Sequence, residues 1–142
     1  MKLRLLLSGI AAAVIYFLLG WLFYGMLFAE FFMNNAGSAT GVFKGEDEMN
    51  LLVIFIGDLA WGFLLTTILG CWFKVKSIGD AAMKGLVLGL LMTAGFDLIM
   101  FGTSNLMNMT STLVDILLGG VMSGIAGLVV GLIVKKETAV SE

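Results

Sequence analysis

The sequence predicts an all-α integral membrane protein, a four-helix bundle with short loops and both termini in the cytoplasm. Its 142 residues are 60% hydrophobic and only 13% charged, with a mean hydropathy of +1.07. Soluble domains average about 25% charged residues, so a water-soluble fold of this composition would lack polar side chains to cover its surface. The apolar residues also form four runs long enough to cross a bilayer, and the basic residues gather on one side of them. We therefore expect one domain, residues 1–142, embedded in the lipid bilayer.

The first membrane span is expected at residues 5–28, directly after the basic residues Lys2 and Arg4. A basic start followed by an apolar stretch is also typical of a secretory signal peptide. The apolar part of a signal peptide is only about 7–15 residues long, whereas this run continues without a charge to residue 28. We therefore interpret the run as a membrane span that is not cleaved.

A polar stretch at residues 30–50 comes next, and we predict that it is a solvated loop because its Gly, Asn and Ser residues favour irregular structure. It contains three consecutive acids, Glu46, Asp47 and Glu48. Calcium loops of the EF-hand type space their ligands over about twelve residues, and consecutive acids on a regular element do not converge on one ion. We predict no metal site here.

Three further spans are expected at residues 51–73, 82–102 and 112–134, and a polar tail follows at 135–142. Seven of the eight Lys and Arg residues fall on one side of the four spans: Lys2, Arg4, Lys74, Lys76, Lys84, Lys135 and Lys136. Lys44 falls on the other side. Because basic residues favour the cytoplasmic side, we expect a multi-pass protein of the inner (plasma) membrane, with both termini and the tail in the cytoplasm.

Three aspartates lie inside the apolar runs: Asp58, Asp97 and Asp115. The expected topology places all three in the outer half of the membrane, and no basic residue lies inside a span to pair with them. Two carboxylates about 8 Å apart repel each other by about 2 kcal/mol at an effective dielectric constant of 20. If the three face a common interior, we expect that at least one is protonated at neutral pH or that a cation shares the site. They are the candidate proton or cation site.

A structural role for the same acids is the alternative. An acid near the start of a helix stabilises the helix dipole, and Asp115, which follows Thr110, Ser111 and Thr112, suits such a capping role. Asp58 fits it less well. Asp97 lies near the expected end of a helix, where the dipole disfavours an acid, so Asp97 is the least explained by structure.

Six glycines form seams of small residues along two spans. Gly85 and Gly89 share a face of the third span, and a stripe with spacings of four, three and four residues runs along the fourth span: Gly120, Gly124, Gly127 and Gly131. Such seams allow close helix packing in membranes. The partner of the last span is either the second span or another copy, which leaves a homo-oligomer or a membrane-protein partner open. The similar segments 58–62 (DLAWG) and 115–119 (DILLG) suggest a weak repeat of two hairpins.

The remaining residue types restrict the function further. Trp21, Tyr24, Trp61 and Trp72 are predicted to be interfacial aromatics, because Trp and Tyr collect where hydrocarbon meets water. The chain has no His and one Cys, so it lacks the most common general base and any intrachain disulfide. We expect no catalytic residues, no cofactor and no enzyme activity. The sequence lacks the block of basic residues that would predict nucleic-acid binding, so we expect no nucleic-acid partner.

Residues 20–33, GWLFYGMLFAEFFM, resemble the G-x-x-W-Y-x-x-x-F-x-x-x-W-M stretch of a family of short four-span bacterial membrane proteins whose function is unknown. Residues 96–127 are similar to the region between the third and fourth spans of that family. There an Asp-Leu, a short link, a Val-Asp and a glycine follow one another, at the positions of Asp97, Asp115 and Gly119 or Gly120. The departures are Phe23 and Phe32 where Trp is usual, and the lack of Pro. The resemblance implies the four-helix fold and a bacterial inner membrane, but no activity.

Two functions are consistent with these observations. One is a structural or accessory module that assembles through the glycine seams. The other is a small proton- or cation-linked transporter that uses Asp58, Asp97 and Asp115.

Overall fold

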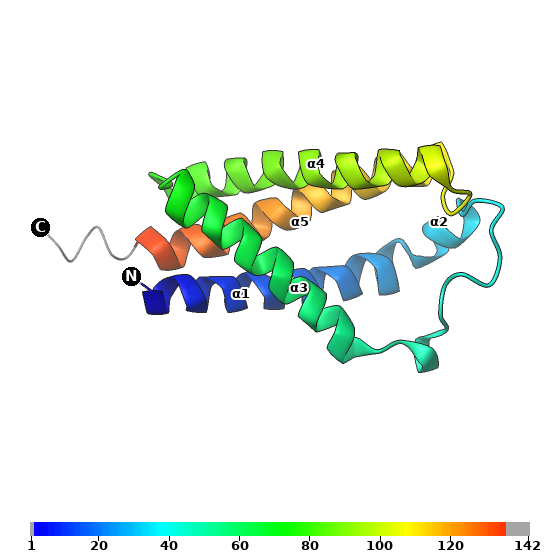
Figure 1. The fold of residues 1–142 in the computed structure, drawn as a ribbon, viewed down its shortest axis with the longest axis horizontal. Coiled ribbons are helices and arrows are strands. Elements are labelled where there is room, and N and C mark those ends of the chain that lie inside the picture. The colour runs from blue at the N-terminus through cyan, green and yellow to red at the C-terminus, as the bar shows by residue number, and fades with distance from the viewer. Residues whose placement is uncertain (1, 136–142) are drawn as a thin grey trace, which may run out of the picture.

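The computed structural model describes residues 2–135 and consists of helices and the segments that connect them (Figure 1). The four long helices are α1 (Lys2–Gly20), α3 (Leu51–Thr66), α4 (Ile78–Thr103) and α5 (Met109–Lys135). With short helical extensions, four stretches are long and apolar enough to cross a membrane: Leu3–Leu27, Leu51–Trp72, Ile78–Thr103 and Met109–Val134. The predicted all-α four-helix fold is confirmed. The predicted tail lies, from residue 136 onward, outside the described residues.

Two of the predicted span boundaries differ from the observed helices. The third helix begins at Ile78 rather than at residue 82, and the fourth begins at Met109 rather than at residue 112. A polar residue caps each of these helices immediately before its first residue. The hydroxyl of Ser77 accepts a hydrogen bond from the amide of Asp80, and the side chain of Asn108 accepts one from the amide of Ser111. Such N-caps begin a helix before its apolar run does.

Helices α1 and α3 each end in a π-helical segment, η1 (Trp21–Leu27) and η3 (Thr67–Trp72). The amide of Phe28 donates to the carbonyl of Phe23 at 2.8 Å, which is the five-residue spacing of a π-turn. The chain contains no Pro to break a helix. π-Turns are rare and frequently mark functional sites, and η1 carries Tyr24.

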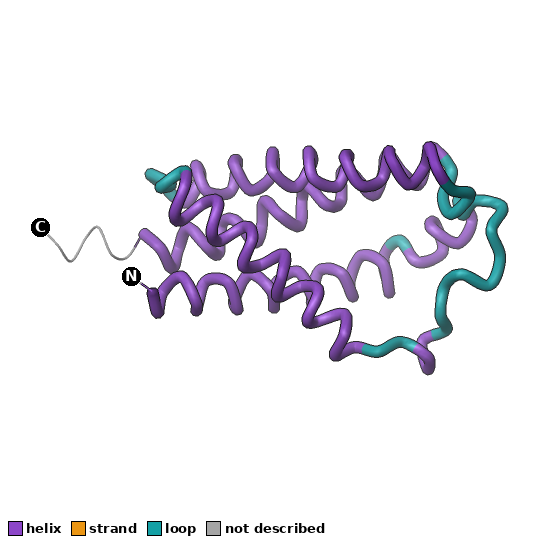
Figure 2. Tube along the Cα trace, in the orientation of Figure 1, coloured by secondary structure: helices purple, strands orange, loops and turns teal. Residues whose placement is uncertain are grey.

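The bundle has two distinct ends. The first turn of α1, the last turn of α5 and the connection from η3 to α4 lie at one end, the terminal end (Figure 1). Residues 35–50 and the α4–α5 link, residues 104–108, lie at the other end, the loop end. The predicted loop 30–50 is partly helical, because Ala29–Asn34 forms α2 and Glu46–Glu48 forms a 3-10 turn, η2. The rest of it has no regular structure (Figure 2).

Hydrogen bonds tie the start of this loop to the α4–α5 link. The amide of Gly37 donates to the carbonyl of Leu106 at 2.9 Å, and the amide of Asn108 donates to the carbonyl of Asn35 at 3.3 Å. The hydroxyl of Ser111 donates to the same Asn35 carbonyl at 2.8 Å. The segment is therefore anchored to α5 at its start, and it reaches α3 only through residues 40–50.

The six predicted packing glycines all lie at the contact between α4 and α5. A Cβ on Gly127 would lie 2.6 Å from the carbonyl oxygen of Ala81, and one on Gly131 would lie 2.7 Å from the Cβ of Ala81. Similar crowding occurs at the other four: Gly85, Gly89, Gly120 and Gly124. The partner of the last span is therefore the third span of the same chain, and neither the second span nor another copy is needed to explain the seam.

Helix α1 packs between α3 and α5. It meets α3 where a Cβ on Gly62 would collide with the backbone of Gly9 and Ala13. The buried core lies around the middle of the bundle and toward its terminal end: Ala12, Tyr16, Leu65, Leu69, Met122, Ala126 and Val130. Toward the loop end α3 diverges from α4 and α5 (Figure 1), and its first residues are exposed. The interior is therefore filled in one half of the bundle and open in the other.

Candidate functional site

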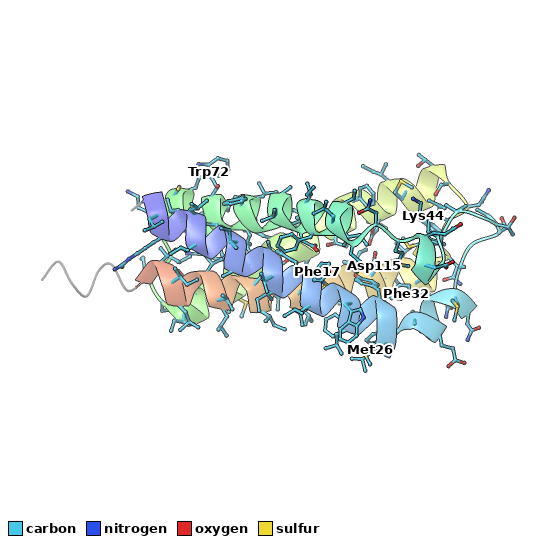
Figure 3. All side chains as sticks on the ribbon, turned by 90° about the horizontal axis from the view of Figure 1, so that it is seen from below. Phe17, Met26, Phe32, Lys44, Trp72 and Asp115 are labelled. Atoms are coloured by element: carbon cyan, nitrogen blue, oxygen red, sulfur yellow. The ribbon has the colours of Figure 1, made fainter. Side chains whose placement is uncertain are left out.

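A cavity of about 250 Å³ lies in the loop half, where α1, η1, α3, α4 and α5 all contribute residues to its wall. Carboxyl groups, aromatic rings and hydroxyl groups line it together. Figure 3 shows one of the lining residues, Asp115, inside the loop half and far from Trp72, which marks the terminal end.

The three aspartates inside the spans all line this cavity: Asp58 comes from α3, Asp97 from α4 and Asp115 from α5. Asp58 lies seven residues after the start of α3, Asp97 six before the end of α4, and Asp115 six after the start of α5. At about 1.5 Å per residue, all three are about 9–10 Å from the loop end of their helices. The structure thus brings the predicted candidate residues to one height of one cavity.

Asp97 is the most buried of the three, with 2% of its surface exposed. Its Oδ2 atom has no hydrogen-bond donor among the described residues. Asp115 faces the same cavity from the neighbouring helix α5. Ionised carboxylates are acceptors only, so this pair can form a hydrogen bond only when one of the two carries a proton.

Asp115 has a second partner on another helix. The Tyr24 hydroxyl, at the π-helical end of the first span, donates to Oδ1 of Asp115 at 2.5 Å. Asp58, across the cavity on α3, has a buried Oδ2 without a donor in the described part of the chain. The described residues that line the cavity include no Lys or Arg to compensate these acids.

The capping role predicted as an alternative for Asp115 is wrong. Asn108 caps α5, and its Oδ1 lies 2.9 Å from the amide of Ser111, so Asp115 lies in the second turn and not at the helix start. Asn50 caps α3 in the same way through the amide of Val53. Neither Asp58 nor Asp115 is needed to begin its helix.

The inner end of the cavity is made of hydroxyl groups and a close helix contact. The Tyr16 hydroxyl donates to Oγ of Ser123 at 2.8 Å, and Tyr16 is only 7% exposed. A Cβ on Gly119 would collide with the side chain of Thr93. Gly119 therefore lets α4 and α5 approach beside the acids, which fixes Asp97 and Asp115 relative to each other.

Four aromatic rings line the cavity: Tyr16, Tyr24, Trp61 and Phe96. Trp61 lies ten residues after the start of α3, about 15 Å along the helix, and lines the cavity with 42% of its surface exposed. The interfacial position expected for Trp61 stays a prediction. Tyr24 likewise lines the cavity, whereas Trp21 and Trp72 are exposed on the outside of the bundle.

Apart from the three aspartates, the residues that line the cavity were not predicted from the sequence to belong to the site, among them Tyr16, Thr93, Phe96 and Ser123. A signal was present, because residues three, four, seven or eight apart share a helix face. Ser123, for example, follows Asp115 by eight residues. A helical projection centred on each aspartate finds such residues. Cavity residues of the π-helical segment are harder to find, because that segment changes the spacing.

The three aspartates of the cavity are not grouped as the side-chain ligands of one metal ion. Within residues 2–135, no three side chains of the metal-ligating types are close enough to hold one ion. The arrangement can hold a proton between Asp97 and Asp115, or a cation whose charge is spread over several acids.

Comparisons with known proteins add no name to this site. No protein-family model, curated protein or solved structure matches the chain. The chemistry of the cavity is therefore the basis on which a function can be assigned.

Proposed function

We propose that this protein is a small membrane transporter that exchanges protons for a cation at the cavity of Asp58, Asp97 and Asp115. One observation carries the proposal: Asp97 is almost fully buried, faces the cavity beside a second carboxyl, and has an oxygen without a donor in the described residues. Buried acids without partners are expensive in a membrane, and those that face a cavity typically belong to ion or proton pathways.

The pair Asp97–Asp115 supplies the exchange chemistry. Two ionised carboxylates in the wall of one cavity repel each other, by about 2 kcal/mol at a separation of about 8 Å and by about 4 kcal/mol at about 4 Å for an effective dielectric constant of 20, so leaving both ionised without a counter-ion is unfavourable. A proton on the pair or a cation beside it relieves this repulsion. Binding of either one lowers the affinity of the pair for the other. Competition between the two ligands for one pair couples their movements in opposite directions.

The two-part packing of the bundle supports access to the cavity from two sides. Helix α1 contacts α3 at Gly62 and through the Phe17–Phe55 ring pair, whereas α4 and α5 make the most extensive contact of the bundle. Rocking of the α1–α3 hairpin against the α4–α5 hairpin would open the packed terminal half and close the loop half, as in transporters built from repeated hairpins. The basic residues near the terminal end support a cytoplasmic location for that end, in a plasma membrane and, by the resemblance, a bacterial inner membrane.

The assembly role predicted from the glycine seams has less support. Those glycines pack α4 against α5 within one chain, so they are not available as an oligomer interface. An accessory module also has no need for three acids in one cavity.

Proton flux in proteoliposomes tests the proposal. The full chain is reconstituted, a pH gradient is imposed, and internal pH is followed with a trapped dye while a series of monovalent inorganic and organic cations is added outside. We expect the wild type to move protons in response to at least one of these cations and Asp97→Asn to lose this flux. The matched control is Asp47→Asn, because Asp47 is exposed in the loop, and this variant should retain wild-type flux.

A second measurement tests whether the cavity holds a proton. Infrared spectra at neutral pH should contain a band from a protonated carboxyl in the wild type and in Asp47→Asn, and this band should be absent in Asp97→Asn. Unchanged proton flux in a folded Asp97→Asn protein would contradict the proposal, and so would a wild type that moves no protons with any of the cations.

A further inference from the structure

We propose that the cation accepted by this cavity is a small organic ammonium ion, held by aromatic faces as well as by carboxylates. The inference rests on the proposed function, because it names the ligand class of that same site. Its basis is the combination, in one wall, of three acids with four aromatic rings from different elements: Tyr16 from α1, Tyr24 from η1, Trp61 from α3 and Phe96 from α4.

Aromatic rings have a negative face, which attracts a cation within about 6 Å and which is the usual means of recognising quaternary ammonium groups. Inorganic ions do not need such a wall. A calcium or magnesium ion takes six or more oxygen ligands at close range, whereas no group of three Asp, Glu, His or Cys side chains among the described residues could hold a metal ion. Met122 adds further apolar surface. The wall therefore suits a cation that keeps apolar groups around its charge.

The acids determine the charge of the ligand. Asp97 offers a buried oxygen that has no donor among the described residues, and Asp115 lies beside it. A protonated pair carries one negative charge and an ionised pair carries two, so one monovalent cation replaces one proton. The other titratable groups that face this pair are Asp58 on α3, Tyr24 on η1 and Tyr16 on α1. We expect an exchange of one proton for one ammonium ion.

The volume determines the size of the ligand. About 250 Å³ is below the range of about 300–1,000 Å³ that is usual for drug-sized ligands. A tetraalkylammonium with methyl groups, or a short primary or secondary amine, fits this space.

Binding of tetramethylammonium to the full chain in lipid nanodiscs, measured by calorimetry, tests this ligand class. The neutral comparison compound is 2,2-dimethylpropan-1-ol, which has a similar size and shape but no charge. We expect the wild type to bind the ammonium ion at least about tenfold more tightly than the alcohol, and to release about one proton per ion bound, as measured in buffers of different ionisation enthalpy.

Two matched variants separate the aromatic contribution from mere apolar contact. Trp61→Leu keeps an apolar side chain and removes the aromatic face, so it should weaken tetramethylammonium binding by about 2- to 30-fold. Trp72→Leu makes the same change at an exposed position of the terminal end and should leave binding unchanged. Equal loss in both variants, or equal affinity for the ion and the alcohol, would overturn the inference.

The two proposals fail in different ways. If Asp97-dependent proton flux occurs with sodium or potassium while tetramethylammonium neither binds nor drives flux, the organic ligand class is wrong and the proton-linked exchange stands. If tetramethylammonium binds in a Trp61-dependent manner and releases a proton, but no flux is found in proteoliposomes, the ligand class stands and the transport function is wrong.

Discussion

The two helical hairpins of this protein use glycine to different extents, and the difference creates the cavity. Helices α4 and α5 are joined by the short link at residues 104–108 and pack through a seam of six glycines. Helices α1 and α3 are separated by a long polar segment, meet closely at Gly9 and Gly62, and diverge toward the loop end (Figure 1). The continuous seam holds α4 and α5 together along their length, whereas the divergence of α3 leaves room for the cavity at the loop end.

The same acid-then-glycine pattern occurs in the second helix of each hairpin. Asp58 precedes Gly62 by four residues, and Asp115 precedes Gly119 by four. Gly62 packs against α1 and Gly119 packs against Thr93 of α4, so each glycine serves the contact within its own hairpin. Beyond these glycines the two helices differ, since α5 continues its glycine stripe and α3 changes into the π-helical η3.

Substitution at the glycine seam should give the largest effect on stability. A Cβ on Gly127 would lie 2.6 Å from the carbonyl oxygen of Ala81 and 3.2 Å from the Cα of Gly85. Because both neighbours are backbone atoms, Gly127→Leu forces the helices apart, and we expect a loss of about 1–3 kcal/mol in the free energy of unfolding. Unfolding of the detergent-solubilised protein by a graded denaturing detergent measures it.

The matched control for the seam is Gly95→Leu on α4. No atom lies within 4 Å of the Cβ position of Gly95, so a side chain there has room, and the better helix propensity of Leu should leave stability unchanged or slightly increased. Equal destabilisation by both substitutions would show that α4 and α5 do not depend on the seam.

The contact between the two hairpins should give the next largest effect. Tyr24→Phe removes the hydrogen bond from η1 to Asp115, and bonds to charged groups contribute about 1.5–3 kcal/mol when they are buried. Tyr24 is partly exposed, so we expect about 1 kcal/mol. A double-mutant cycle of Tyr24→Phe with Asp115→Asn measures the coupling energy, and a coupling near zero would contradict the contact.

Tyr16→Phe is the natural comparison for Tyr24→Phe. It removes a neutral hydrogen bond from α1 to Ser123 of α5 and leaves the acids untouched. We expect a similar loss of stability and a smaller change in proton flux than Tyr24→Phe causes.

The cost of placing each residue type in a membrane explains which parts of the structure could be predicted from the sequence. Four apolar runs separated by charges are enough to define four helices, and an aspartate within such a run is conspicuous because it is costly to insert. The aromatic residues of the cavity are not conspicuous, since Trp61 and Phe96 look the same whether they face lipid, a neighbouring helix or a cavity. Their position depends on how α3 diverges from α4, which is a property of the packed chain.

Other differences have local causes. The starts of α4 and α5 were predicted too late because Ser77 and Asn108 cap these helices, and polar residues in the first turn delay the apolar runs. The π-helical segment η1 could not be predicted, because no Pro or charge marks it. The glycine stripe alone did not identify its partner, because small residues on α5 fit any close helix; the short link at residues 104–108 is the sequence feature that favours α4.

Loss of the hydrogen bond that ties the loop to α5 should have the smallest effect on stability. Ser111→Ala removes the hydrogen bond from the Ser111 hydroxyl to the carbonyl of Asn35 and should cost about 0.5–1.5 kcal/mol locally. Limited proteolysis of residues 35–50 should accelerate, whereas the midpoint of global unfolding should hardly change. Ser104→Ala removes a bond within α4 and is the control, in which the cleavage rate should stay at the wild-type value.

Because hydrogen bonds fix the start of the loop at the α4–α5 link and α5, only residues 40–50 form a free connecting segment to the first turn of α3. Fully extended, these residues could reach about 36–40 Å, which is more than the whole thickness of the hydrocarbon core. Such a long connecting segment restrains α3 only weakly, and doubling its length would change the free energy of loop closure by only about 0.6 kcal/mol. Under the proposed transport function, the balance between inward-open and outward-open forms would therefore depend on the contacts among the helices and on the ligand, and residues 40–50 would act only as a flexible connection.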